Sequence, residues 1–107
     1  MIDSIDAASY DAKVTQATRP VVVDFYGQNC PPCEKLHPIL EDLSAQYGDR
    51  ATFVKIDIED ASDLAAELGV FSVPTVLFYS GGAPVDKVVG VPPKAKLAAK
   101  IDGLLAG

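Results

Sequence analysis

The sequence predicts an α/β fold, in which a mixed central sheet of four to five strands is flanked by four helices. Short β-branched runs alternate with segments of helical spacing along the whole chain. Strands separated by helices favour parallel pairing, and the Ser80-Gly81-Gly82 hairpin signal adds an antiparallel pair. The 107 residues fit one domain, 1–107, and show no repeat or obvious linker.

The first half of the chain supplies two predicted helices and two predicted strands. Residues 6–17 carry apolar side chains at mixed helical spacing and are predicted as a helix. Residues 20–26 are β-branched and aromatic, as in a buried strand. Residues 33–47 have the apolar spacing of a helix, which Pro38 is expected to kink. Residues 51–58 alternate in polarity and are predicted as a strand.

The second half is predicted to hold a helix, a hairpin and a last helix. Asp60 is the expected N-cap of the third helix, and Gly69 its closing residue. Residues 75–79 and 85–89 are the two strands of the hairpin. Pro93 stands near the start of the last helix, where its missing N–H does no harm.

Composition limits the classes of partner. Apolar residues make up 49% of the chain, which is enough for a core without a metal. The net charge of −6, spread along the chain, argues against nucleic acid and anionic lipid as partners. No segment approaches the ~18 apolar residues of a membrane span, and the N-terminus has no basic region typical of a secretory signal. We therefore expect a cytoplasmic protein, with a monomer as the default state.

Cys30 and Cys33 stand three residues apart, where the predicted strand 20–26 passes into the predicted helix 33–47. At this spacing the two sulfurs can form a disulfide or face each other as a dithiol. A helix N-terminus presents unpaired N–H groups and a partial positive charge. Both stabilise a thiolate, which is the nucleophile in disulfide exchange.

The positions of the two cysteines predict their roles. Cys30, at the exposed helix tip, is expected to attack a substrate disulfide, and Cys33, more buried, to resolve the mixed disulfide. Zinc is an alternative, but a tetrahedral site needs four ligands and the chain has two Cys and one His. A zinc site shared across a dimer stays open. A structural disulfide would not explain the strand–CxxC–helix context, so we expect redox chemistry without a cofactor.

Six short motifs extend the pattern beyond the cysteines. They are Val23-Asp24-Phe25-Tyr26, Cys30-Pro31-Pro32-Cys33, Pro38-Ile39-Leu40, Val54-Lys55-Ile56-Asp57, Val73-Pro74-Thr75 and Gly90. In order and spacing they resemble the thioredoxin family, over nearly the whole chain. The resemblance implies the thioredoxin fold, with Cys30 as the nucleophile and Cys33 as the resolving thiol.

The resemblance also implies a proton acceptor. Asp24 matches the family's buried acid behind the active site, and a carboxylate without full solvation has a raised pKa. Asp24 is therefore expected to take the proton from Cys33; the alternative is a strand residue at the sheet edge, satisfied by hydrogen bonds. Lys55 matches the basic partner of this acid, or is a solvated strand lysine.

A substrate-binding surface is implied as well. Pro74 matches the family's cis-proline loop facing the cysteines, where the Val73 backbone would pair with an extended substrate segment. From the sequence alone, Pro74 is an ordinary loop proline before a strand. Gly90 matches the glycine that lets a second loop approach the cysteines. Val91, Val73 and Pro31 would form an apolar rim suited to docking a protein.

Three positions depart from the family pattern. The family typically has tryptophan just before the first cysteine and again three residues earlier, but here Asn29 and Tyr26 stand there and the chain has no tryptophan. The usual Gly-Pro between the cysteines is Pro31-Pro32. We expect these changes to alter recognition by a standard thioredoxin reductase.

His37 is the only histidine of the chain, four residues after Cys33 on the same predicted helix. This spacing puts both side chains on one helix face. His37 is then either a group that tunes the proton on Cys33 or Asp24, or a partly buried packing residue.

These observations predict a protein-disulfide reductase, a thioredoxin-like electron carrier. Its expected partners are protein disulfides and a thioredoxin-reductase-type electron donor. The alternatives are a protein disulfide oxidase or isomerase, a glutaredoxin-like protein, and a non-catalytic binding module with this fold. A cytoplasmic setting favours reduction over oxidation.

Overall fold

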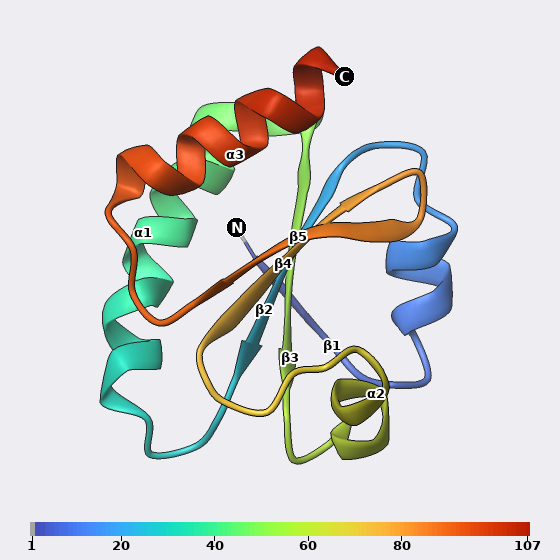
Figure 1. Ribbon diagram of the computed structural model, residues 1–107, viewed down its shortest axis with the longest axis vertical. Helices are drawn as coiled ribbons and strands as arrows, with labels where there is room; N and C mark the ends of the chain where they lie inside the picture. Colours follow the sequence, from blue (N-terminus) through green and yellow to red (C-terminus); the bar gives the residue numbers. More distant parts are fainter. Residues whose placement is uncertain (1) are drawn as a thin grey trace.

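The computed structural model describes residues 2–107, which form one five-stranded sheet with helices on both faces (Figure 1). The strands are β1 (Asp3–Ile5), β2 (Val21–Tyr26), β3 (Thr52–Asp57), β4 (Thr75–Ser80) and β5 (Ala83–Val89). The helices are α1 (Pro31–Tyr47), α2 (Ser62–Glu67) and α3 (Lys94–Ala106), with a π-helical turn η1 (Asp11–Thr15) and a 3-10 turn η2 (Gly48–Arg50). The predicted α/β class and mixed sheet are confirmed.

The strand order β1-β3-β2-β4-β5 places β2 at the centre of the sheet. β1 and β2 both run parallel to β3, as expected for β2 and β3, which α1 connects. β4 is antiparallel to β2, so the expected parallel pairing after α2 is wrong. The six residues of α2 span only about 9 Å, too short to carry the chain back along the sheet. β4 therefore starts at the same end of the sheet at which β3 finishes, and it runs in the opposite direction (Figure 1).

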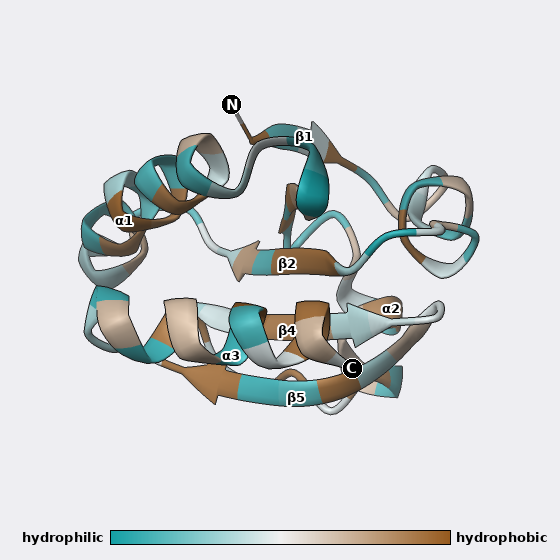
Figure 2. Cartoon of the chain, turned by 90° about the horizontal axis from the view of Figure 1, so that it is seen from above, coloured by the Kyte–Doolittle hydropathy of each residue, from teal (hydrophilic) through white to brown (hydrophobic). Residues whose placement is uncertain are grey.

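The core is divided by the sheet into two layers. α1 and α3 cover one face, whereas η1 and α2 lie on the other (Figure 1). Side chains of β2 alternate between the faces: Val22 packs in the α1 and α3 layer, and Val23 in the opposite layer. Asp24 shares the face of Val22, because strand side chains repeat every second residue. In Figure 2, β2 is largely hydrophobic along its length.

The N-terminal segment differs from its prediction. The predicted helix over 6–17 is reduced to η1, and β1 before it was not predicted. The Asp6 carboxylate accepts hydrogen bonds from both the backbone N–H and the hydroxyl of Ser9. The Asp6 N–H donates to the Ser9 hydroxyl in return, so the two residues form a reciprocal cap before the helical turn. β1 has only three residues, too few to show a strand pattern in the sequence. It is a strand because it pairs with β3.

Two of the predicted helix ends are confirmed and one is wrong. Gly69 ends α2 with a positive φ of 75°, as expected of a closing glycine. Pro93 is the N-cap of α3. Asp60 is not the N-cap of α2; Ala61 is, and its N–H donates to the Asp57 carbonyl, which already closes the turn.

α1 begins at Pro31, two residues before its predicted start. It continues through Pro38, and the kink expected there stays a prediction. Among residues 2–107, none of the helices combines the length and apolar character needed to cross a bilayer.

Candidate active site

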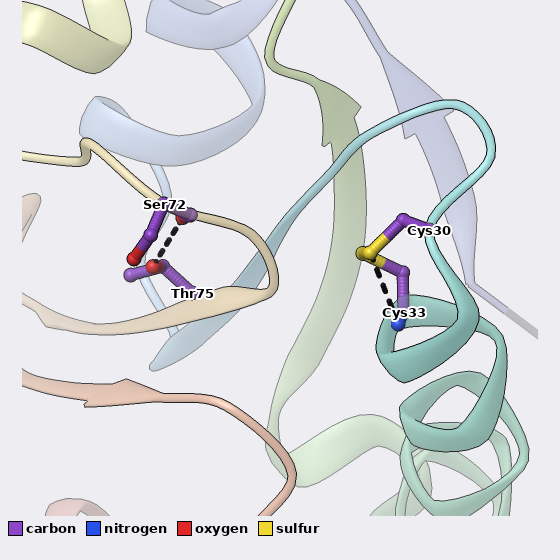
Figure 3. The surroundings of a disulfide bond; sticks show 4 residues. All are labelled: Cys30, Cys33, Ser72 and Thr75. Carbon is purple, nitrogen blue, oxygen red and sulfur yellow. Dashed lines mark hydrogen bonds between the residues drawn. A yellow bond between two sulfur atoms is a disulfide. The ribbon is translucent and has the colours of Figure 1, made fainter.

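The two cysteines form a disulfide at the start of α1, with their Cα atoms 5.2 Å apart (Figure 3). Cys30 is the N-cap residue, and its Sγ accepts a hydrogen bond of 3.2 Å from the backbone N–H of Cys33. Pro31 and Pro32 occupy the first helical positions, where their missing N–H groups do no harm. The helix tip thus directs an amide donor at the sulfur of Cys30.

Burial does not separate the two cysteines as the sequence predicted. Cys30 is 9% exposed, so the expectation of an exposed Cys30 is wrong; Cys33, at 7%, is the more buried of the two by a small margin only. The disulfide itself draws the two side chains together under one part of the surface. What distinguishes them is position: Cys30 accepts the amide hydrogen bond at the helix tip, and Cys33 lies within the helix.

Two residues of the loop before the cysteines, Gly27 and Asn29, suit its backbone path. Asn29 has a φ of 51°, the left-handed region that asparagine tolerates better than most side chains. At Gly27, a side chain would meet Val73 Cγ2 at 3.2 Å. Gly27 therefore lets the cysteine loop approach the loop that carries Val73.

Asp24 is the buried acid of the site. It is 3% exposed, and its Oδ1 has no hydrogen-bond partner within residues 2–107. Burial raises the pKa of Asp24 to about 7, while the charge of Lys55 opposes the rise. The alternative of an edge-strand acid satisfied by hydrogen bonds is wrong, because β2 is central and this oxygen is unpaired.

A pocket of about 230 Å³ connects Asp24 with the cysteine helix. Lys55, the register partner of Asp24 on β3, lines the pocket and lies 5.5 Å from the centre of the Tyr26 ring. Tyr26 also lines the pocket, so its ring and the Lys55 side chain lie side by side in one wall. The remaining lining residues are Gly27, Gln28, Asn29, Cys33, Glu34 and His37.

The two loops expected to bind substrate lie together. The Val73–Pro74 peptide bond is cis. The N–H of Gly90 donates to the Pro74 carbonyl at 2.9 Å, which joins the second loop to the first. The Thr75 hydroxyl donates to the Ser72 carbonyl at 2.7 Å and closes the turn, shown beside the disulfide in Figure 3.

Apolar side chains are exposed on these loops. Pro31 and Val91 are exposed, and Val73 is half-buried. Phe71, on the loop of Val73, is 82% exposed, the largest exposed fraction among the large hydrophobic residues of 2–107.

Two residues of this region were missed by the sequence analysis. Gln28 lines the pocket, and its Nε2 donates to Asp57 Oδ2 at 2.7 Å, which fixes this wall. No sequence signal marks a glutamine in a loop for such a role. No sequence signal marks Phe71 either, because its neighbour Val70 on the same loop is buried in the core.

A vicinal cysteine pair at a helix tip, backed by a buried acid and flanked by a cis-proline loop, defines a thiol–disulfide oxidoreductase. Within residues 2–107, no three His, Cys, Asp or Glu side chains are grouped to hold a metal ion.

Comparison with known proteins identifies the family. The thioredoxin family model matches residues 1–103. Thioredoxins of Staphylococcus aureus strains Mu50, MW2 and N315 are each 39% identical over 101 residues, which cover 94% of this chain and 95% of theirs. The chain belongs to the thioredoxin family, and it acts as a protein-disulfide reductase through its Cys30–Cys33 pair.

Proposed function

We propose that Cys30 is the attacking nucleophile of this electron carrier and that Cys33 is the resolving thiol. The observation that carries this assignment is the hydrogen bond from the Cys33 N–H to the Sγ of Cys30. An amide donor at a helix N-terminus stabilises negative charge on the sulfur it faces. Cys33 has no such position, since it lies inside the first turn of α1.

In the proposed cycle, the Cys30 thiolate attacks one sulfur of a substrate disulfide. The other substrate sulfur leaves as a thiolate and takes a proton from solvent. Cys33 then gives up its proton and attacks the Sγ of Cys30, which releases the second substrate thiolate. The substrate gains two electrons, and the protein ends with the Cys30–Cys33 disulfide present in the structure.

Asp24 is the proposed acceptor of the Cys33 proton. Both residues line the same pocket, so a water molecule could bridge them. A pKa of about 7 leaves the Asp24 carboxyl able to take and release a proton at neutral pH. The role proposed for Lys55 is to keep part of the carboxyl population ionised through its charge.

The proposed docking surface for the substrate surrounds the disulfide. The Val73 backbone, beside Pro74, would pair with an extended substrate segment, and Gly90 holds the neighbouring loop against Pro74. The side chains of the segment would contact Pro31 and Val91, which the family resemblance implied, and Phe71, which it did not. This surface suits an unfolded or extended protein chain with an apolar residue near its disulfide.

The electron donor is proposed to be a reductase that docks on this same surface. Asn29 replaces the family tryptophan next to Cys30, so the donor must tolerate a smaller polar side chain there. We further propose that the protein works as a monomer in the cytoplasm, where reduction of disulfides is favoured.

Reduction of insulin disulfides by dithiothreitol tests the assignment. We expect Cys30→Ser to abolish the activity, and Cys33→Ser to abolish turnover while trapping a mixed disulfide with the substrate. The matched pair separates attack from resolution, because each variant removes one sulfur. Activity in Cys30→Ser, or trapping by Cys30→Ser instead of Cys33→Ser, would reverse the roles. No activity in the unchanged protein would favour a binding module, and a reduction potential well above that of thioredoxins would favour an oxidase.

A further inference from the structure

His37 and Asp24 line the same pocket, although they come from different elements. The His37 side chain is 40% exposed, whereas Asp24 is 3% exposed. The pocket therefore connects a buried carboxyl to an imidazole that reaches solvent. None of the steps proposed above uses His37.

The cycle creates a need for proton movement at this position. At a pKa of about 7, part of the Asp24 population holds a proton at neutral pH, and this proton must leave before Asp24 can accept the one from Cys33 in the resolution step. Its Oδ1 is buried without a hydrogen-bond partner within residues 2–107, so no side chain is placed to take a proton directly from this oxygen. A pocket of about 230 Å³ has room for several water molecules, each of which occupies about 30 Å³.

We propose that His37 relays protons between the Asp24 carboxyl and solvent, through water in this pocket. The inference rests on the function proposed above for Asp24. An imidazole can accept a proton on one nitrogen and release one from the other, and it does so most readily near neutral pH. No bond to sulfur changes in this step: one proton leaves Asp24, and one proton reaches solvent from His37.

The groups around His37 are compatible with this role. Glu41, one turn further along α1, places its Oε1 3.7 Å from His37 Nε2. The other titratable groups lining the pocket are Cys33 and Glu34 on α1, Asp24 and Tyr26 on β2, and Lys55 on β3.

The relay can be measured with the reduced protein and 5,5′-dithiobis(2-nitrobenzoic acid). Attack by Cys30 releases the first coloured thiolate at a rate proportional to reagent concentration, and resolution by Cys33 releases the second at a rate independent of it. We expect His37→Gln to leave the first phase unchanged and to slow the second about tenfold near neutral pH. This is less than the about 10²-fold effect of a direct acid–base group, because water still enters the pocket.

Three further measurements separate a relay from a structural effect. Imidazole added to His37→Ala should restore the second phase, whereas a merely structural role would not respond to it. Lys35→Gln, on an exposed face of α1 away from the pocket lining, should change neither phase. In an Asp24→Asn background, His37→Gln should have no further effect on the second phase.

Two results would overturn the relay while the proposed function stands. One is a second phase in His37→Gln equal to that of the unchanged protein from about pH 6 to 9. The other is a slow phase that imidazole does not restore and that is slow to the same degree at every pH. Failure of the unchanged protein to react in two phases would instead contradict the roles of Cys30 and Cys33.

Discussion

Replacing Asp24 by asparagine should remove a pH dependence of stability that the buried carboxyl creates. Its pKa is 3.8 in an exposed chain and about 7 in the folded protein. A raised pKa means that the folded state holds the proton more tightly, so stability is full below about pH 4 and falls as pH rises to about 7. Over that window the free energy of unfolding should drop by about 4 kcal/mol, and above it this loss stays constant.

Urea denaturation of the oxidised protein, followed by far-ultraviolet circular dichroism, measures this effect. Asp24→Asn is neutral at every pH, so its advantage over the unchanged protein should grow by up to about 4 kcal/mol between about pH 4 and 7. Asp49→Asn, at an exposed position, is the matched control. Its stability difference from the unchanged protein should not grow over this pH range. A difference between the unchanged protein and Asp24→Asn that stays constant across this range would refute the argument.

Two more substitutions test the surface and the hairpin. Phe71→Ser should raise the KM for a protein disulfide about fivefold, the equivalent of about 1 kcal/mol of lost apolar contact, without changing the rate with a small disulfide reagent; an unchanged KM would remove Phe71 from the docking surface. Gly82→Ala should cost about 2 kcal/mol or more in urea denaturation, because Gly82 has a φ of 82° and an added Cβ would overlap the Thr15 carbonyl oxygen. The control Gly103→Ala, in open space on α3, should be neutral or stabilising, and an equal loss in both variants would contradict this reasoning.

The parts of the fold that local sequence determines were predicted, and those that depend on distant partners were not. The sequence shows α1 by its apolar spacing and β2 by its β-branched run, because each element buries a regular set of side chains. β1 shows no such pattern, since its three residues gain order only by pairing with β3. The helix predicted over 6–17 is shortened to the turn Asp11–Thr15, and Asp6 and Ser9 cap its approach with reciprocal hydrogen bonds.

The site divides in a similar way. The cysteine motif carries its own chemistry, so spacing and a helix start were sufficient to predict it. Asp24 gained its assignment from the family resemblance, because an acid in a strand gives no sign of whether its carboxyl is paired. His37 and Asp24 line the same pocket because of the way α1 lies over β2, and no single segment of the sequence determines that packing.

Both reactive sulfurs are carried by the first turn of one helix, and this limits how the electron donor and the electron acceptor can bind. The bond joins two residues of that turn, and the sheet behind it contributes no atom to the bond. A donor and an acceptor must therefore visit the same small patch, one after the other. Prompt departure of each partner then matters as much as its arrival, because a partner that lingers blocks the next delivery of electrons.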